Sequence, residues 1–231
     1  MKALQAHIPL LDLFYPTPCS ACSTPLLRGE ELICLSCRMD MPYARIHDMS
    51  YNAIETRLMG RFPFEAATSL LYFVKNGRVQ HLMHRLKYEG HREVGEWMGA
   101  SLAEELLSSE RFHAMDYLIP VPLHPRKKKM RGYNQSEVIA QGMEQKGYGK
   151  LKHALKRVVD NTSQTRKDSL ERWANVQDVF ELDDSRELEG KRLLLLDDVM
   201  TTGATLEACA NQLIKVDGVR LYVATIACAE F

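Results

Sequence analysis

The sequence predicts an α/β protein, in which a parallel sheet is flanked by helices and preceded by a small cysteine-rich module. Three observations predict this fold class. Residues 193–196 are four consecutive leucines, typical of a strand buried on both faces of a parallel sheet. From residue 66 onward, apolar strand-like runs alternate with amphipathic helical runs. Two C-x2-C pairs lie near the N-terminus, as in small metal-bound modules.

Length and composition restrict the class of protein. The chain has 231 residues, of which 45% are hydrophobic and 26% charged, which suits one medium domain with a small appendage. A formal net charge of zero excludes a wholly polyanion-binding surface but allows a local basic patch. The apolar stretch 8–15 is interrupted by Pro9 and Asp12 and is too short to span a membrane. We therefore expect no signal peptide, no membrane insertion and a cytoplasmic location.

The cysteine pairs predict a structural metal site. Cys19-x2-Cys22 and Cys34-x2-Cys37 supply four thiolates that can close tetrahedrally on one Zn²⁺. The protein then fills all four positions, which leaves none open for catalysis. A pair of disulfides is the alternative, and the reducing compartment inferred above disfavours it.

The rest of the chain divides into predicted elements and domains. We predict a zinc ribbon over residues 1–45, an irregular connector over 46–65 and the α/β domain over 66–231. Within that domain we expect strands at 66–74, 117–122, 152–159, 178–182, 193–196 and 219–226, and helices at 78–88, 92–107, 135–145, 169–175 and from 206.

A short stretch after the leucine run predicts the ligand. Asp197 and Asp198 follow the strand, and the small, hydroxyl-rich loop Thr201-Thr202-Gly203-Ala204-Thr205 leads into a helix. Free amides at a helix start bind anions. The loop has neither a P-loop nor a dinucleotide motif, so it suits a single terminal phosphate. Adjacent acids would repel that phosphate and are expected to face sugar hydroxyls or hydrated Mg²⁺.

This thirteen-residue stretch resembles the phosphoribosyl pyrophosphate (PRPP) motif of type I phosphoribosyltransferases: an apolar strand, paired acids and a T-T-G-x-T loop. The resemblance implies that the ligand is PRPP. It also implies that the site needs a second, cationic region for the pyrophosphate at C1′.

A basic segment follows the strand predicted at 117–122. We expect its five cations to lie in a loop. A run of cations is usually a solvated surface segment, but this run follows the carboxyl end of a strand, which is where ligands of parallel sheets bind. Contact with pyrophosphate and contact with the phosphates of single-stranded nucleic acid both stay open. The arginines are the stronger anchors because guanidinium grips phosphate bidentately. The candidates are Arg126, Lys127, Lys128, Lys129 and Arg131.

A polar stretch at 161–168 lies between the predicted strands at 152–159 and 178–182. It is either an idle surface loop or a flap that closes over PRPP and excludes water from a reactive sugar cation. The flexible-loop candidates are Gln164, Thr165, Arg166 and Lys167.

Taken together, the motifs resemble the ComF competence family over nearly the full chain. The motifs are the four-cysteine module, L-K-Y-x-G at 86–90, P-V-P-L-H at 120–124, R-G-Y-N-Q at 131–135, Q-T-R at 164–166 and the PRPP motif. The family implies a zinc ribbon fused to a type I phosphoribosyltransferase-like domain. It also implies a cytoplasmic role in DNA uptake and natural transformation, the handling of single-stranded DNA and a helicase-like partner.

By position in the family, Asp197 and Asp198 match the ribose-binding acids, 201–205 matches the 5′-phosphate loop, and Arg131, Asn134 and Gln135 match the segment on the pyrophosphate side. Two functions follow. One is a transferase that binds PRPP with Mg²⁺ and releases pyrophosphate. The other is a non-catalytic factor that senses PRPP or handles single-stranded DNA. The sequence contains no recognisable base-specificity element, so no acceptor is predicted.

Overall fold

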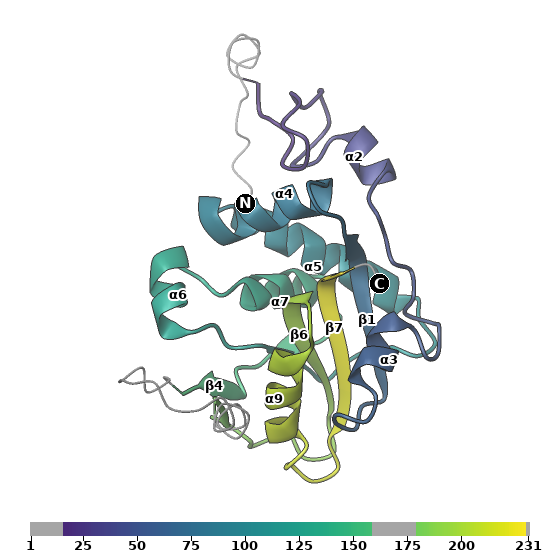
Figure 1. Ribbon diagram of the computed structural model, residues 1–231, viewed down its shortest axis with the longest axis vertical. Helices are drawn as coiled ribbons and strands as arrows, with labels where there is room; N and C mark the ends of the chain where they lie inside the picture. The colour runs from purple at the N-terminus through teal and green to yellow at the C-terminus, as the bar shows by residue number, and fades with distance from the viewer. Residues whose placement is uncertain (1–15, 159–178, 230–231) are drawn as a thin grey trace, which may run out of the picture.

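The computed structural model describes residues 16–158 and 179–229. They form a five-stranded parallel sheet in the order β1-β7-β6-β2-β3 (Figure 1), which confirms the predicted fold class. The flexible-loop candidates at 164–167 and the helix predicted at 169–175 lie outside the described residues. In chain order the elements are α2 (Leu35–Met39), α3 (Ala53–Leu58), β1 (Ala66–Phe73), α4 (Arg78–His84), the π-helix η1 (Arg85–Glu89), α5 (Arg92–Leu107), β2 (Tyr117–Pro120), α6 (Pro125–Arg131), α7 (Gln135–Gln145), β3 (Lys150–Leu151), β4 (Leu155–Arg157), β5 (Phe180–Leu182), β6 (Arg192–Met200), α9 (Ala204–Leu213) and β7 (Arg220–Ala229).

Helices cover both faces of the sheet. Helices α4, α5 and α7 pack on one face, and α3, α9 and the antiparallel hairpin β4–β5 pack on the other (Figure 1). The leucine run in β6 serves both layers, because Leu194 and Leu196 face the first and Leu193 and Leu195 face the second. The strand is therefore buried on both sides, as the sequence predicts. None of the helices in the described ranges is both long and apolar enough to cross a membrane.

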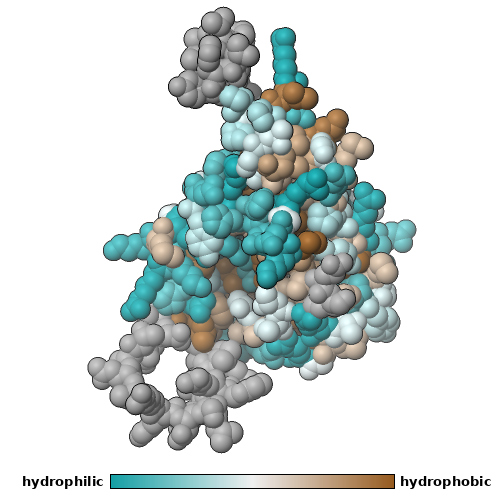
Figure 2. Space-filling view, turned by 45° about the horizontal axis from the view of Figure 1, so that its top comes forward, coloured by the Kyte–Doolittle hydropathy of each residue, from teal (hydrophilic) through white to brown (hydrophobic). Residues whose placement is uncertain are grey.

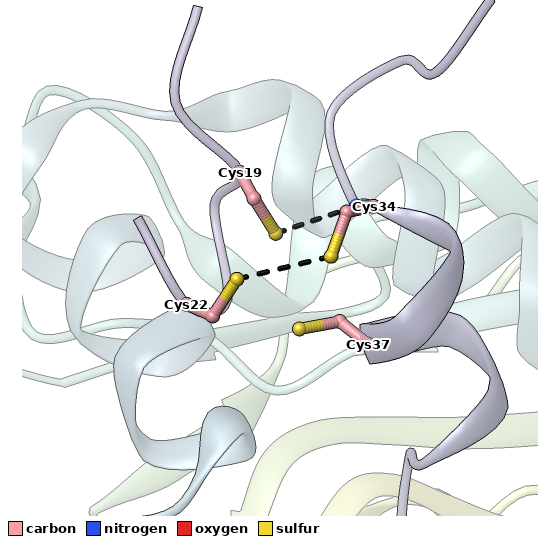
Figure 3. Close-up of side chains that lie close together, drawn as sticks. All are labelled: Cys19, Cys22, Cys34 and Cys37. Atoms are coloured by element: carbon pink, nitrogen blue, oxygen red, sulfur yellow. Dashed lines mark hydrogen bonds between the residues drawn. The ribbon is translucent and has the colours of Figure 1, made fainter. Parts of the chain in front are cut away.

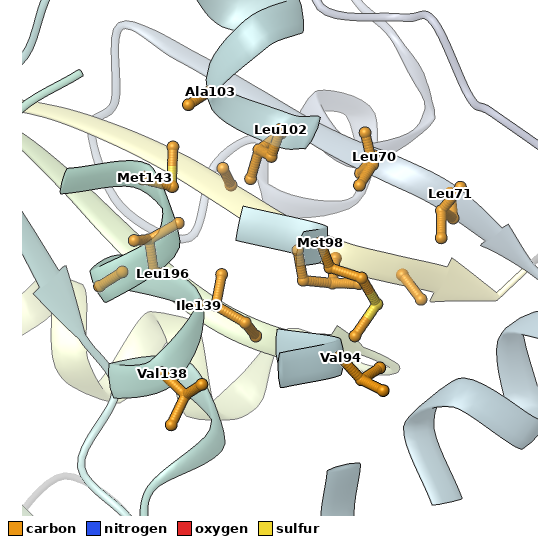
Figure 4. Packing of buried hydrophobic residues seen from close by; sticks show 14 of the residues in the cluster. Leu70, Leu71, Val94, Met98, Leu102, Ala103, Val138, Ile139, Met143 and Leu196 are labelled. Atoms are coloured by element: carbon orange, nitrogen blue, oxygen red, sulfur yellow. The ribbon is translucent and has the colours of Figure 1, made fainter. Parts of the chain in front are cut away.

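The α5–α7 pair forms the tightest helix contact of the first layer, and two glycines permit it. A Cβ added at Gly99 would lie 2.0 Å from the carbonyl oxygen of Ile139, and one added at Gly142 would lie 2.1 Å from that of Glu96. Val94, Met98, Leu102, Val138 and Met143 fill the space between these helices and the sheet (Figure 4). Helix α7 is thus held in one position over the sheet, which matters because its first turn reaches the site described below.

The sheet topology has a point of the kind at which ligands of open α/β sheets usually bind. Strands β2 and β6 are neighbours, but β2 leads through α6 and α7 to β3 on one side, whereas β6 leads through α9 to β7 on the other. The carboxyl ends of two strands whose connections diverge in this way form the usual ligand site of an open α/β sheet. Pairing of β2 ends with Pro120 opposite Leu196, and β6 continues to Met200. Asp197 and Asp198 therefore lie in the part of β6 that β2 leaves uncovered, inside the strand rather than after it.

Two expectations about local structure are wrong. The stretch 46–65 is not irregular, because it contains α3, whose amides at Ile54 and Glu55 donate to the Asn52 side chain at 3.0 Å. The basic segment is not a loop but helix α6. Pro125 occupies its first turn, the His124 ring accepts from the Arg126 amide at 3.2 Å, and Gly132 ends it at φ +81°.

Candidate functional site

The two acids at the centre of the site have separate partners. The Lys87 Nζ lies 2.8 Å from Asp198 Oδ2. Asp197 Oδ1 accepts a hydrogen bond from Ser136 Oγ at 3.2 Å, in the first turn of α7, and another from the Asp198 amide at 2.8 Å. Burial, followed by the neighbouring charge of Asp198, raises the pKa of Asp197 to about 7. The protonated form of Asp197 is therefore favoured to a higher pH than that of an ordinary aspartate.

The loop 201–205 joins β6 to α9. Gly203 is the N-terminal cap of α9 at φ +80°, a conformation that only glycine adopts without strain. Thr201, Thr202 and Thr205 are exposed, and the Thr202 hydroxyl accepts a hydrogen bond from the Ala204 amide at 3.4 Å, so the loop brings hydroxyl side chains to the start of a helix. This arrangement is chemically suited to a phosphate group.

Two arginines of α3 and its C-terminal extension fix that loop. Arg57 donates to the carbonyl oxygen of Thr201, and Arg61 donates to that of Thr202. Arg61 also makes hydrogen bonds of 2.6 and 2.9 Å to Glu207 Oε2 in the first turns of α9. A Cβ at Gly203 would lie 2.9 Å from Arg61 Nη1 and 2.9 Å from Leu58 Cδ2. The loop is thus packed from behind, and two positive charges lie next to it.

The structure divides the basic segment into two parts. Residues 126–129 are exposed on α6, which projects from the body of the molecule (Figure 1), and its side chains make a hydrophilic projection on the surface (Figure 2). Arg131 instead points back: its guanidinium lies 5.3 Å from the centre of the Tyr88 ring, and its Nη1 donates to Gln135 at 2.7 Å. Of the five predicted cations, Arg131 is the one that contacts the π-helix carrying Lys87.

That π-helix connects two of the sequence motifs. Tyr133 of R-G-Y-N-Q donates its hydroxyl to the carbonyl oxygen of Leu86 in L-K-Y-x-G. Asn134 donates to the carbonyl oxygen of Val121 at 2.9 Å and caps α7 by accepting from the Ser136 amide. π-Helical turns occur often at functional sites, and this one places Lys87 against Asp198.

The four cysteines lie together as predicted. Their Sγ atoms are all within 4.8 Å of one another and point toward a common centre (Figure 3). Cys22 and Cys34 have their Sγ atoms 3.8 Å apart, and sulfurs about 2.3 Å from a tetrahedral Zn²⁺ are separated by about 3.8 Å. The amides of Ala21 and Cys34 donate to Cys19 Sγ at 3.4 and 3.3 Å and hold this sulfur in place. The cluster can therefore hold a metal ion such as zinc.

Sequence reasoning misses several residues of the site. Lys87 belongs to a motif to which the sequence assigns no role, and no pattern singles out Ser136. Arg57 and Arg61 lie in the stretch predicted to be irregular, where the N-x-x-E pattern of Asn52 and Glu55 is a capping signal that indicates a helix.

Parts of this chain are similar to known proteins and to one protein family. Residues 129–229 match the family model of the phosphoribosyl transferase domain. Competence protein F of Haemophilus influenzae is 29% identical over 140 residues, a match that covers 58% of this chain and 61% of that protein. Competence protein ComFC of Bacillus subtilis is 24% identical over 207 residues, covering 82% of this chain and 81% of that one. A solved glutamine PRPP amidotransferase from B. subtilis aligns with a TM-score of 0.41 and 16% identity, over 61% of this chain and 30% of that one.

Proposed function

We propose that this chain, which belongs to the ComF family and carries a phosphoribosyltransferase-like domain, binds PRPP with Mg²⁺ at the carboxyl ends of β2 and β6. One observation carries the proposal. The acids Asp197 and Asp198 and the helix start at Gly203 are adjacent at the point where the connections of the sheet diverge. A sugar diol and a terminal phosphate on one small ligand require such a juxtaposition.

In this proposal, different residues of the site bind different groups of the ligand. Asp197 and Asp198 accept hydrogen bonds from the ribose hydroxyls, and the amides and hydroxyl groups of 201–205 bind the 5′-phosphate. Lys87, paired with Asp198, and Arg131, beside the Tyr88 ring, supply positive charge toward the pyrophosphate. In a transfer reaction these groups would orient the sugar and stabilise the departing pyrophosphate. The chemistry needed from the protein is positioning and charge.

Two metals belong to the proposal. Carboxylate oxygens are suitable ligands for a hydrated Mg²⁺, and Asp197 and Asp198 are the acids that would contact an Mg²⁺ bound together with PRPP. The ion would neutralise part of the negative charge of the phosphates. The four-cysteine cluster would hold Zn²⁺ structurally. We expect metal analysis of the purified protein to find about one zinc per chain. A metal-free protein with four normally titrating thiols would refute the zinc site.

The test is calorimetric titration with PRPP and Mg²⁺, comparing the wild type with the double variant Asp197→Asn and Asp198→Asn. We expect affinity to fall at least about a hundredfold, because each hydrogen bond to a charged group contributes roughly 1.5–3 kcal/mol. Zinc content and the circular dichroism spectrum serve as controls for folding. Unchanged affinity would show that the acids do not meet the ligand.

A second function is favoured by the exposure of α6. Its cations at 126–129 project into solvent, where phosphates of single-stranded DNA can reach them without entering the PRPP site. The chain would then be a DNA-handling factor that keeps the binding site without turnover. Pyrophosphate release from PRPP in the presence of candidate bases favours the transferase. DNA binding without such release favours the second function.

A further inference from the structure

Helix α4 contacts the four-cysteine module along one face. The Arg78 Nη2 lies 3.1 Å from Asp40 Oδ2, and Arg85 Nη2 donates to Ser23 Oγ at 3.3 Å. Between them, His81 Nδ1 lies 3.1 Å from the carbonyl oxygen of Ala21; because a carbonyl only accepts, this nitrogen carries the proton. Positions 78, 81 and 85 share one face of a helix, so successive turns of α4 and the start of the π-helix hold the module.

The contact is apolar as well as polar. Cys19 and Cys37 of the metal cluster are buried in the same hydrophobic cluster as Val79, Leu82 and Leu86 of the helix. Ala21, whose carbonyl binds His81, lies between two of the cysteines, and its amide donates to Cys19 Sγ. The first cysteine pair is therefore joined directly to α4, and the metal cluster is packed into the body of the protein.

The other end of the same helical segment reaches the ligand site. The π-helix continues α4 without interruption from Arg85 and carries Lys87, whose Nζ lies 2.8 Å from Asp198 Oδ2. Lys87 is only two residues beyond Arg85, which donates to Ser23 of the module. The helical segment 78–89 thus has the metal cluster on one face and an acid of the proposed PRPP site at its end.

We propose that the four-cysteine module positions Lys87 against Asp198 by holding α4 and the π-helix, so that the metal cluster supports the ligand site. This inference rests on the proposed function. Ser23, Asp40 and His81 are positioning residues, because they reach the site only through the helix. The module is thereby required for ligand affinity even though it touches no ligand.

The test loosens the contact without altering a cysteine. Ser23→Gly, Asp40→Asn and His81→Ala are combined; glycine suits the positive φ of +62° at Ser23. The matched control is Arg28→Ala, which removes a charge from the same module outside the contact described above. Both proteins are compared with the wild type by zinc analysis, hydrogen exchange and calorimetric titration with PRPP and Mg²⁺.

We expect one zinc per chain in all three proteins. In the combined variant, amides of 85–89 should exchange faster than in the wild type, and PRPP affinity should fall about 2- to 30-fold, the usual range for mutations that act through intervening structure. The Arg28→Ala protein should match the wild type in both measurements. If the combined variant loses zinc, His81→Ala alone is measured, with the same expected directions.

A double-mutant cycle tests the route through Lys87. In a Lys87→Met background, the combined variant should lose no further affinity, because the group that it positions is gone. An undiminished loss in that background overturns the inference, and so does unchanged exchange at 85–89 in a zinc-loaded variant. If the wild type itself fails to bind PRPP, the proposed function fails, and hydrogen exchange still decides whether the module holds the π-helix.

Discussion

Two of the regions that could contact an anion, the loop 201–205 and helix α6, are built differently. The loop 201–205 is held from behind by Arg57 and Arg61, and its central glycine is buried against Leu58. Helix α6 projects from the body, and residues 126–129 are exposed along it. In the loop, the backbone geometry is fixed before a ligand binds. Helix α6 offers positive charge, but it does so on exposed side chains.

This difference indicates which region determines ligand specificity and which region mainly attracts anions. Preorganised donors discriminate by distance and direction, because they gain nothing from a ligand of the wrong shape. Exposed lysines on a short helix act over longer distances and are screened by salt. We therefore expect the loop to determine which phosphate binds, and α6 to determine how quickly and at what ionic strength an anion is captured.

The largest effect expected within this comparison of the two regions concerns two glycines, one in each region. Gly203 and Gly132 have φ of +80° and +81°, but a Cβ at Gly203 meets Arg61 and Leu58, whereas one at Gly132 meets nothing within 4 Å. Alanine at either position costs roughly 1–2 kcal/mol of backbone strain. Gly203→Ala must also displace the loop, so PRPP affinity should fall about 10- to 100-fold, as when a charge-assisted hydrogen bond is removed.

Calorimetric titration and thermal unfolding of the two variants separate these contributions. Gly132→Ala should bind PRPP within about threefold of the wild type, since a helix end without neighbours can absorb the strain. Equal losses of affinity in the two variants would contradict the view that only the loop is preorganised.

A second expected effect, on stability rather than on PRPP affinity, concerns the acids beside the loop. Burial and the charge of Asp198 raise the pKa of Asp197 to about 7, above the usual value for an aspartate of about 3.9. Between these two values the folded state holds a proton that the unfolded state has released, so this group lowers stability as pH rises through that window. Asp197→Asn mimics the protonated acid and should remove this contribution.

Urea denaturation of both proteins at pH 5, 6, 7 and 8 measures the difference. The stability of Asp197→Asn relative to the wild type should increase with pH and level off above about pH 7, by an amount on the order of a few kcal/mol. A difference that is flat across this range would mean that Asp197 is ionised throughout. Ser136→Ala is a useful comparison, because removing its hydrogen bond to Asp197 should raise the pKa of that acid further.

The sequence predicts the parts of the molecule that have local periodicity. The predicted helices 92–107 and 135–145 have the same bounds in the structure, because each has a regular apolar face. The cysteine spacing predicts the cluster for a similar reason, since each C-x2-C pair places two ligands on one knuckle. Strand β6 is recognisable because four leucines leave no polar face.

What could not be predicted depends on contacts between distant residues or on helices without an apolar stripe. Arg61 and Thr202 lie 141 positions apart, and no pattern around Arg61 indicates that it holds the loop 201–205. Helix α6 contains mostly cations and has no buried residue, so it has no apolar periodicity that would predict a helix. Its sequence signals are Pro125 at the start and Gly132 at the end. The pairing of Lys87 with Asp198 depends on a π-helical turn, which sequence periodicity does not reveal.

The smallest expected effect on PRPP binding comes from α6. Replacing Arg126, Lys127, Lys128 and Lys129 with alanine should change stability by about 0.5 kcal/mol or less and PRPP affinity by less than about threefold, since these side chains lie on the exposed, projecting helix. Binding of a single-stranded oligonucleotide should change instead. The slope of log K against log salt should flatten by about 0.7 for each phosphate group that the variant no longer neutralises.

Fluorescence titration across a salt series provides this slope. Lys150→Ala is the control, because Lys150 begins β3 at the amino edge of the sheet, opposite the site, and should leave the slope unchanged. If the quadruple variant keeps the wild-type slope, DNA binds elsewhere on the protein, and the four-cysteine module becomes the region to test. If the quadruple variant instead loses PRPP affinity as strongly as Gly203→Ala does, α6 is part of the preorganised site. A helix that only attracts anions is expected to contribute little to the affinity of PRPP, because in the proposed site the loop 201–205 and the two acids bind this ligand.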